Sequence, residues 1–100
     1  MAKLKLTVAC DKYDYLQPLR DGQIQAEGID LNLITVESGI RHERMVHYGE
    51  YDACEFSMSS YLVARGQDID RFQAIPFFPR RMWGHKFCFI RAGSGVKTPS

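Results

Sequence analysis

The sequence predicts an α/β domain in which a mostly parallel sheet carries helices on both faces, giving three layers. The first observation is that apolar runs of strand length alternate with helix-like segments in the order β-α-β-α-β-α-β-β, which is typical of parallel sheets. The second is composition, because 45% hydrophobic and 25% charged residues are ordinary for a globular chain. One hundred residues allow one domain or one lobe of a larger protein.

The first third of the chain holds two predicted strands around one predicted helix. The run Leu4–Cys10 is apolar and β-branched, which favours a buried strand. A helix is expected over residues 16–24, with Pro18 in its first turn and Gly28 closing the region. Ile29–Val36 alternates apolar and polar residues, which indicates a second strand.

A second helix and a third strand are predicted next. Ser38 is a good N-cap for a helix over Ile40–Tyr48, and Gly49 ends that helix. Its apolar face is formed by Ile40, Met45 and Tyr48. Tyr51–Phe56 then reads as a short third strand.

The remainder of the chain is predicted to hold one more helix and one more strand. Ser57–Ser60 cap a helix that runs from Tyr61 to about Arg65. Phe72–Phe78 is expected to be extended. Lys86–Arg91 is apolar on both faces, which predicts a central strand. Residues 93–100 are rich in Gly and Ser and read as a linker.

Charge and hydropathy exclude two classes of partner. The net charge is +1, so there is no broad field to attract nucleic acid or anionic lipid. No apolar run approaches the roughly 20 residues that a membrane span needs. The start of the chain also lacks the apolar core of a signal peptide. We therefore expect a cytoplasmic protein without nucleic-acid or membrane partners.

The cysteines and histidines do not form a recognisable metal motif. Cys10, Cys54 and Cys88 are an odd number and have no C-x-x-C spacing, which favours buried reduced thiols over a zinc site or a catalytic thiol. His42 and His47 are five residues apart and do not share a helix face. We predict no metal site from these residues.

The segment Ile75–His85 is the most informative stretch of the chain. Its two prolines keep the backbone extended and remove two N–H donors. Arg80 and Arg81 are permanently charged and offer planar forks that fit carboxylates. His85 can exchange a proton near neutral pH. A rigid, aromatic and doubly basic segment suits an aromatic acid better than it suits a hydrophobic core.

The predicted sheet also indicates where a ligand would bind. In such sheets ligands bind beyond the carboxyl ends of the strands. Three loops are expected to meet at that edge, and they comprise Cys10–Tyr15, Glu37–Arg41 and Glu55–Tyr61.

Four motifs, in a fixed order and spacing, resemble the 4,5-dihydroxyphthalate decarboxylase family. The resembling stretches are Tyr13-Asp14, Pro18–Gly22 with Glu27–Leu31, Tyr51–Leu62, and Ala74–Met82. Together they span nearly the whole chain. The chain departs from the family pattern at Trp83-Gly84-His85, where an aromatic and then a basic residue are expected before the histidine.

The resemblance implies a fold, an activity and an alternative. The fold is lobe one of a type II periplasmic-binding-protein-like fold. The activity is non-oxidative decarboxylation of an aromatic dicarboxylate such as 4,5-dihydroxyphthalate to protocatechuate, without a cofactor, by a full-length protein that forms a homo-oligomer. The alternative is a solute-binding protein of an ABC transporter for a small aromatic or carboxylate ligand, because many relatives carry that label.

Family members are longer than this chain, which bears on its domain organisation. Residues 1–92 are expected to be a partial N-terminal lobe, and residues 93–100 to lead toward a second lobe. Half of the cleft would then be missing. We expect the isolated chain to be inactive.

Cofactor-free decarboxylation of an aromatic acid needs an anchored carboxylate, a desolvated leaving carboxylate and a proton for the ring carbon. Arg80 and Arg81 are the candidates to bind the retained carboxylate. Neighbouring residues in a strand point opposite ways, so one of the two faces the cleft; a solvated basic pair is the alternative. His85 is the candidate proton donor, against a surface histidine.

Further candidates precede this segment. The hydroxyls and free N–H groups at the start of the third helix predict an anion site or a simple cap, and the serines concerned are Ser57, Ser59 and Ser60. Glu55 is a candidate catalytic residue that pairs with an arginine or a ring hydroxyl, or else a strand-end charge. Tyr13 and Tyr15 are expected to stack on an aromatic ligand, or else to pack in the protein.

Overall fold

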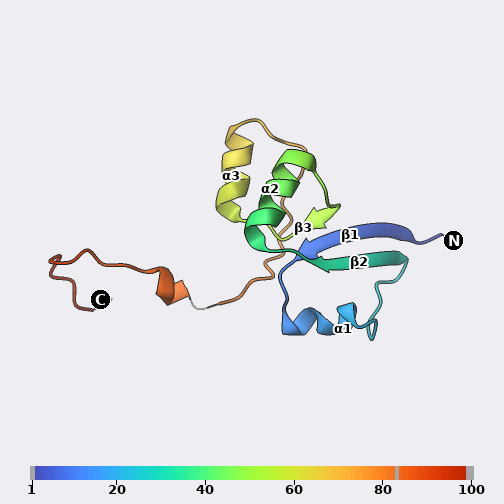
Figure 1. The fold of residues 1–100 in the computed structure, drawn as a ribbon, viewed down its shortest axis with the longest axis horizontal. Helices are drawn as coiled ribbons and strands as arrows, with labels where there is room; N and C mark the ends of the chain where they lie inside the picture. Colours follow the sequence, from blue (N-terminus) through green and yellow to red (C-terminus); the bar gives the residue numbers. More distant parts are fainter. Residues whose placement is uncertain (1, 83, 99–100) are drawn as a thin grey trace.

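The computed structural model describes residues 2–82 and 84–98, and at residues 85 and 86 it describes the backbone alone. The elements are β1 (Leu4–Cys10), the 3-10 helix η1 (Asp14–Leu16), α1 (Gln17–Arg20), β2 (Ile29–Thr35), α2 (Ser38–Tyr48), β3 (Ala53–Cys54), α3 (Met58–Gly66) and the 3-10 helix η2 (Gly84–Phe87). Figure 1 shows α1 on one side of the two long strands and α2 and α3 on the other. The predicted α/β class is confirmed.

The sheet has three parallel strands in the order β2-β1-β3. β1 pairs with β2 over its whole length, from Leu4 opposite Ile29 to Cys10 opposite Thr35. β3 pairs with β1 only through Ala53 and Cys54. The first strand of the chain is therefore the central one.

This strand order creates a topological switch point between β1 and β3. The chain passes from β1 to β2 on one side of β1 and then returns to β3 on the other side. Such a switch point is where open α/β sheets bind their ligands.

The helix ends are set by specific caps. Glu37, rather than the predicted Ser38, is the N-cap of α2, because its carboxylate accepts hydrogen bonds from the N–H groups of Gly39 and Ile40. These two backbone hydrogen bonds lower the pKa of Glu37 below its usual value. Gly49 ends the helix with a φ of 55°, a left-handed conformation that glycine adopts at little cost.

The core is small and lies between α2 and the sheet. Ala9 of β1, Met45 of α2 and Tyr51 form its buried centre. The partly buried side chains that pack against it are Ile34, Val36, Cys54, Phe56 and Phe72. The predicted apolar face of α2 is wrong in part: Met45 is buried, but Ile40 and Tyr48 are exposed, and Arg41 takes the buried position one turn before Met45.

Three predicted elements are confirmed with different bounds. The first helix is shorter than residues 16–24, because η1 precedes it and α1 ends at Arg20. The third strand keeps two residues, although Asp52 N–H and Glu55 N–H still donate to β1 at Thr7 O and Ala9 O. The third helix begins three residues before Tyr61, directly after its Ser57 cap.

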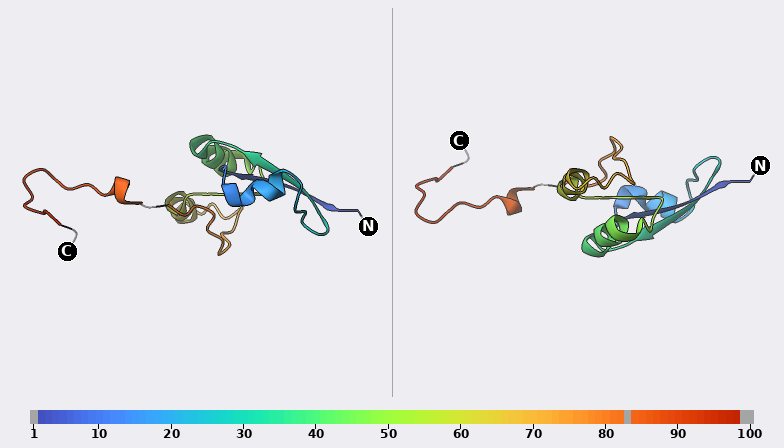
Figure 2. Two further views of the ribbon diagram at one scale, coloured as in Figure 1. Left: turned by 90° about the horizontal axis from the view of Figure 1, so that it is seen from below. Right: turned by 90° about the horizontal axis from the view of Figure 1, so that it is seen from above.

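The predicted central strand Lys86–Arg91 is wrong. Gly84–Phe87 forms η2, and none of the described residues after Cys54 lies in a strand. Residues 84–98 extend away from the sheet in all three views (Figures 1 and 2), and Phe89 is 87% exposed. A strand that is apolar on both faces needs a paired strand on either side, and the strand pairs of the described chain join only β1 to β2 and β1 to β3. Within residues 2–82 and 84–98, no helix is long and apolar enough to cross a membrane.

Candidate functional site

A cluster of polar side chains lies at the switch point between β1 and β3. Glu55 directly follows β3, while Asp11 and Tyr13 follow β1. Arg41 reaches the same place from the first turn of α2. The parallel strands position these residues, since their carboxyl ends meet at one edge of the sheet.

Glu55 is the centre of this cluster. Its Oε2 accepts a hydrogen bond from the Asp11 N–H at 3.0 Å and pairs with an Arg41 guanidinium nitrogen at 3.4 Å. Its Oε1 accepts a hydrogen bond from the Tyr13 hydroxyl. Within the described residues Glu55 therefore pairs with one arginine, Arg41, and accepts one tyrosine hydroxyl, that of Tyr13.

Arg41 is 1% exposed and is the one charged side chain among the buried described residues. Its Nε donates to Glu55 O at 2.8 Å, and Nη1 donates to Val36 O. The guanidinium thus joins the ends of β2 and β3 through their backbone carbonyls. A buried cation needs such partners, because an unpaired one costs several kcal/mol, on the order of 3–5.

Tyr13 and Tyr15 form a stacked pair beside Glu55. Their ring centroids are 5.5 Å apart and their planes make an angle of 20°. Desolvation, and after it the hydrogen bond to the Glu55 carboxylate, raises the pKa of Tyr13 well above its usual range. Tyr13 therefore stays protonated across the neutral pH range. The Tyr15 ring is exposed, and its hydroxyl donates to Pro79 O.

The Ile75–His85 segment is connected to this cluster through Arg80. An Arg80 guanidinium nitrogen lies 3.3 Å from Asp11 Oδ2. Arg81 is exposed and makes no ion pair with any described residue. The His85 side chain and Trp83, two further parts of the sequence hypothesis, lie outside the described residues.

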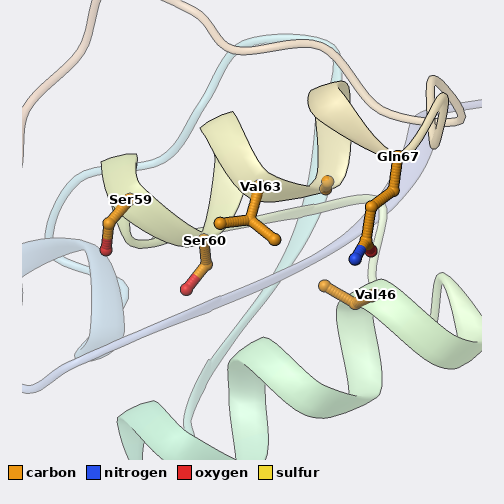
Figure 3. Close-up of a pocket in the computed structure, with 6 residues that line it drawn as sticks. Val46, Ser59, Ser60, Val63 and Gln67 are labelled. Carbon is orange, nitrogen blue, oxygen red and sulfur yellow. The ribbon is translucent and has the colours of Figure 1, made fainter.

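The hydrogen bonds of the three serines of the sequence hypothesis do not involve Glu55 within the described chain. Ser57 Oγ accepts the Ser60 N–H at 3.5 Å and lies 2.8 Å from Ser59 Oγ, so it acts as the cap of α3. Ser59 and Ser60 line an open groove of about 280 Å³ between α2 and α3 (Figure 3). The other residues that line it are Val46, Val63, Ala64 and Gln67, none of which belongs to the Glu55 cluster.

Arg41, Asp11 and Arg20 are missing from the sequence-based candidates. Arg20 donates to Asp11 O at 3.1 Å, to Leu33 O at 3.3 Å and to Cys10 Sγ at 3.4 Å, which connects α1 to the ends of β1 and β2. A signal for Arg41 was available. A cation in the first turn of a helix is opposed by the helix dipole, so its position one turn before the buried Met45 indicates a specific partner.

Cys10 is buried and Cys54 is partly buried, but Cys88 is exposed, so the prediction of buried thiols is wrong for Cys88. Burial raises the pKa of Cys10, and it raises the pKa of Cys54 to about 11. Both thiols are thus poorly ionised near neutral pH, and the catalytic-thiol alternative loses support. Among the described residues, no three His, Cys, Asp or Glu side chains gather closely enough to hold a metal ion.

Comparison with known proteins identifies the family. The chain is 34% identical over 100 residues to the 4,5-dihydroxyphthalate decarboxylase of Comamonas testosteroni, and 33% identical over 98 residues to that of Pseudomonas putida. The chain belongs to the 4,5-dihydroxyphthalate decarboxylase family. It spans 30% and 38% of the lengths of these two relatives. No protein-family profile matches the chain.

For this member of the decarboxylase family, the switch-point cluster holds four of the sequence-based candidates. These are Tyr13, Tyr15, Glu55 and Arg80, which are connected through Asp11, Pro79 and Arg41. The cluster offers a protonated phenol, an exposed aromatic face and a cation with an exchangeable partner. These are groups that an aromatic acid can use.

Proposed function

We propose that the full-length protein containing this sequence decarboxylates an aromatic dicarboxylate such as 4,5-dihydroxyphthalate, giving protocatechuate. The observation that supports this most is the similarity to two proteins named for that activity, which extends over 98% and 100% of the chain. Neither relative is named as a transporter component, so the solute-binding alternative gains no support. The proposal keeps the type II periplasmic-binding-protein-like lobe, with which a parallel sheet is compatible.

Arg80 is the proposed anchor for the substrate. Its ion pair with Asp11 is largely exposed, and exposed pairs contribute only about 0–1 kcal/mol. A substrate carboxylate can therefore replace Asp11 at little cost and gain a charge-assisted hydrogen bond. The exposed Tyr15 ring, stacked on Tyr13, offers an aromatic face for the substrate ring.

The reaction requires movement of one electron pair and one proton. The bond between the ring carbon and the departing carboxylate breaks, its electrons pass to the ring carbon, and CO2 leaves. A ring hydroxyl of the substrate supports the developing charge. The ring carbon then takes a proton, for which His85 remains the proposed donor, with Glu55 and Tyr13 holding the site on the β1 side.

We also propose that the full-length protein is located in the cytoplasm and forms a homo-oligomer.

Incubation of the full-length protein with 4,5-dihydroxyphthalate tests the proposal. We expect equal amounts of CO2 and protocatechuate, followed by gas analysis and chromatography, with and without an added divalent metal ion. Phthalate without ring hydroxyls is the matched control and should react far more slowly. Tight binding of the acid without CO2 release would overturn the proposal in favour of a binding protein.

A further inference from the structure

We infer that Arg41 is a positioning residue of this site, which fixes the Glu55 carboxylate and, through it, the Tyr13 hydroxyl at the switch point between β1 and β3. The inference rests on the proposed function for its catalytic meaning. The positioning itself follows from three layers of contact: strand ends to Arg41, Arg41 to Glu55, and Glu55 to Tyr13.

The first layer fixes the guanidinium. Arg41 is buried, and two of its nitrogens donate to Val36 O and Glu55 O. Both carbonyls follow strands of the same sheet, so the plane of the guanidinium is set by the backbone of β2 and β3. The planar fork of arginine can make such fixed contacts, whereas a lysine ammonium cannot reproduce them.

The second layer fixes the carboxylate. The remaining terminal nitrogen of Arg41 pairs with Glu55 Oε2, which also accepts the Asp11 N–H. Two donors on Oε2 define the rotamer of the Glu55 side chain and direct Oε1 toward Tyr13. A carboxylate has about four lone-pair sites, so Oε1 keeps the capacity to accept the Tyr13 hydroxyl.

The third layer fixes the phenol. With Glu55 as its acceptor, the Tyr13 hydroxyl keeps its proton and one orientation, and its ring stays stacked on Tyr15. The charged groups that face Tyr13 are Glu55, Arg80 and Asp11. Of these, Glu55 raises the pKa of Tyr13 both as a hydrogen-bond acceptor and as a charge. Arg41 acts on Tyr13 through Glu55.

The helix itself offers a matched control. Arg44 lies three residues after Arg41 on α2 and pairs with Glu50 at 3.3 Å. That pair is about half exposed and has no connection to the tyrosines among the described residues. A substitution at Arg44 removes an arginine–glutamate pair from the same helix without touching the Glu55 cluster.

The test uses full-length Arg41→Lys, Arg41→Met and Glu55→Gln proteins, with Arg44→Met as control. The titration of Tyr13 is followed by NMR of ring-labelled tyrosine, assigned with a Tyr13→Phe protein. We expect the Tyr13 pKa to fall toward 10.0, its ordinary value, in all three site variants and to be unchanged in Arg44→Met. We expect kcat to fall on the order of a hundredfold in Arg41→Met, with a smaller change in KM.

CO2 release tests the proposed function, and the titration of Tyr13 tests the positioning by Arg41. Absence of CO2 release by the unmodified protein would refute the proposed function, while the tyrosine titration would still test the positioning. If Arg41→Met does not fold, Arg41→Lys decides. A Tyr13 that titrates in folded Arg41→Lys as it does in the unmodified protein, together with unchanged kcat, would overturn the inference.

Discussion

Two ion pairs lie at the same edge of the sheet, with almost the same length and opposite surroundings. The Arg41–Glu55 pair measures 3.4 Å, and its side chains are 2% and 10% exposed. The Arg80–Asp11 pair measures 3.3 Å, and its side chains are 55% and 32% exposed. Burial rather than distance therefore distinguishes them. The first pair holds strand ends in place, and the second leaves a cation that a ligand can use.

The largest effect should come from breaking the buried pair. Arg41→Met leaves Glu55 without its charged partner and removes the donors to Val36 O and Glu55 O. We expect the free energy of unfolding of the full-length protein to fall by about 3–5 kcal/mol, measured by urea denaturation. The double variant Arg41→Met/Glu55→Gln should recover part of this loss. A loss below about 1 kcal/mol, as for exposed pairs, would contradict the comparison.

Breaking the exposed pair should affect binding rather than stability. Arg80→Gln removes the proposed anchor of the substrate carboxylate, so we expect KM to rise roughly ten- to hundredfold. The free energy of unfolding should change by less than about 1 kcal/mol. Arg81→Gln is the matched control and should leave KM nearly unchanged. Equal effects of the two substitutions would indicate a solvated basic pair.

Partial burial of His42 next to Arg41 should also make the protein sensitive to acid. Burial, and after it the charge of Arg41, lowers the pKa of His42 below its ordinary 6.5. The folded protein thus favours neutral His42, so this stabilisation is complete above pH 6.5 and is lost as the pH falls toward the lower folded pKa. His42→Phe keeps the ring that packs against Phe56.

Unfolding midpoints compared between about pH 7 and pH 5 measure this effect. We expect His42→Phe to lose less stability on acidification than the unmodified protein. The unmodified protein is the reference. Identical pH dependence in the two proteins would show that the folded state does not lower the pKa of His42.

The smallest effect is expected at Arg44, whose pair with Glu50 is the exposed counterpart on the same helix. Arg44→Ala should change the free energy of unfolding by less than about 1 kcal/mol, and added salt should abolish even this change. Urea denaturation at low and high salt measures it. A large, salt-independent loss of unfolding free energy would mean that solvent exposure does not explain the different contributions of Arg41 and Arg44.

The body of the fold follows from local patterns in the sequence. β1 has the predicted bounds, β2 ends one residue earlier than predicted, and α2 begins two residues earlier. In each case the signal lies in the element or directly beside it: the apolar pattern for the two strands, and Glu37 and Gly49 at the two ends of α2. The prediction of a strand over Lys86–Arg91 is wrong because an apolar run becomes a central strand only when other strands lie on both sides of it. Its own residues do not specify those partner strands.

In the candidate site, too, some features follow from local residues and others depend on distant parts of the chain. Tyr13, Tyr15, Glu55 and Arg80 have side chains whose chemistry suits an aromatic acid, and this was visible without a structure. The partners of Arg41 were not visible, because they depend on how α2 packs against the ends of β2 and β3. Fourteen residues separate Arg41 from Glu55, and only the packing of the helix on the sheet brings them together.

The central place of β1 has a consequence for how the protein is made. Of the three strands, β1 is synthesised first; it can pair on one side once β2 is available, but its other side waits for Ala53 and Cys54. Pairing across such sequence separations is slow, because loop-closure entropy must be overcome first. Until then Ala9, the most buried core residue, has no cover from Tyr51. β1 therefore has its full set of partner strands only after Cys54 has been synthesised.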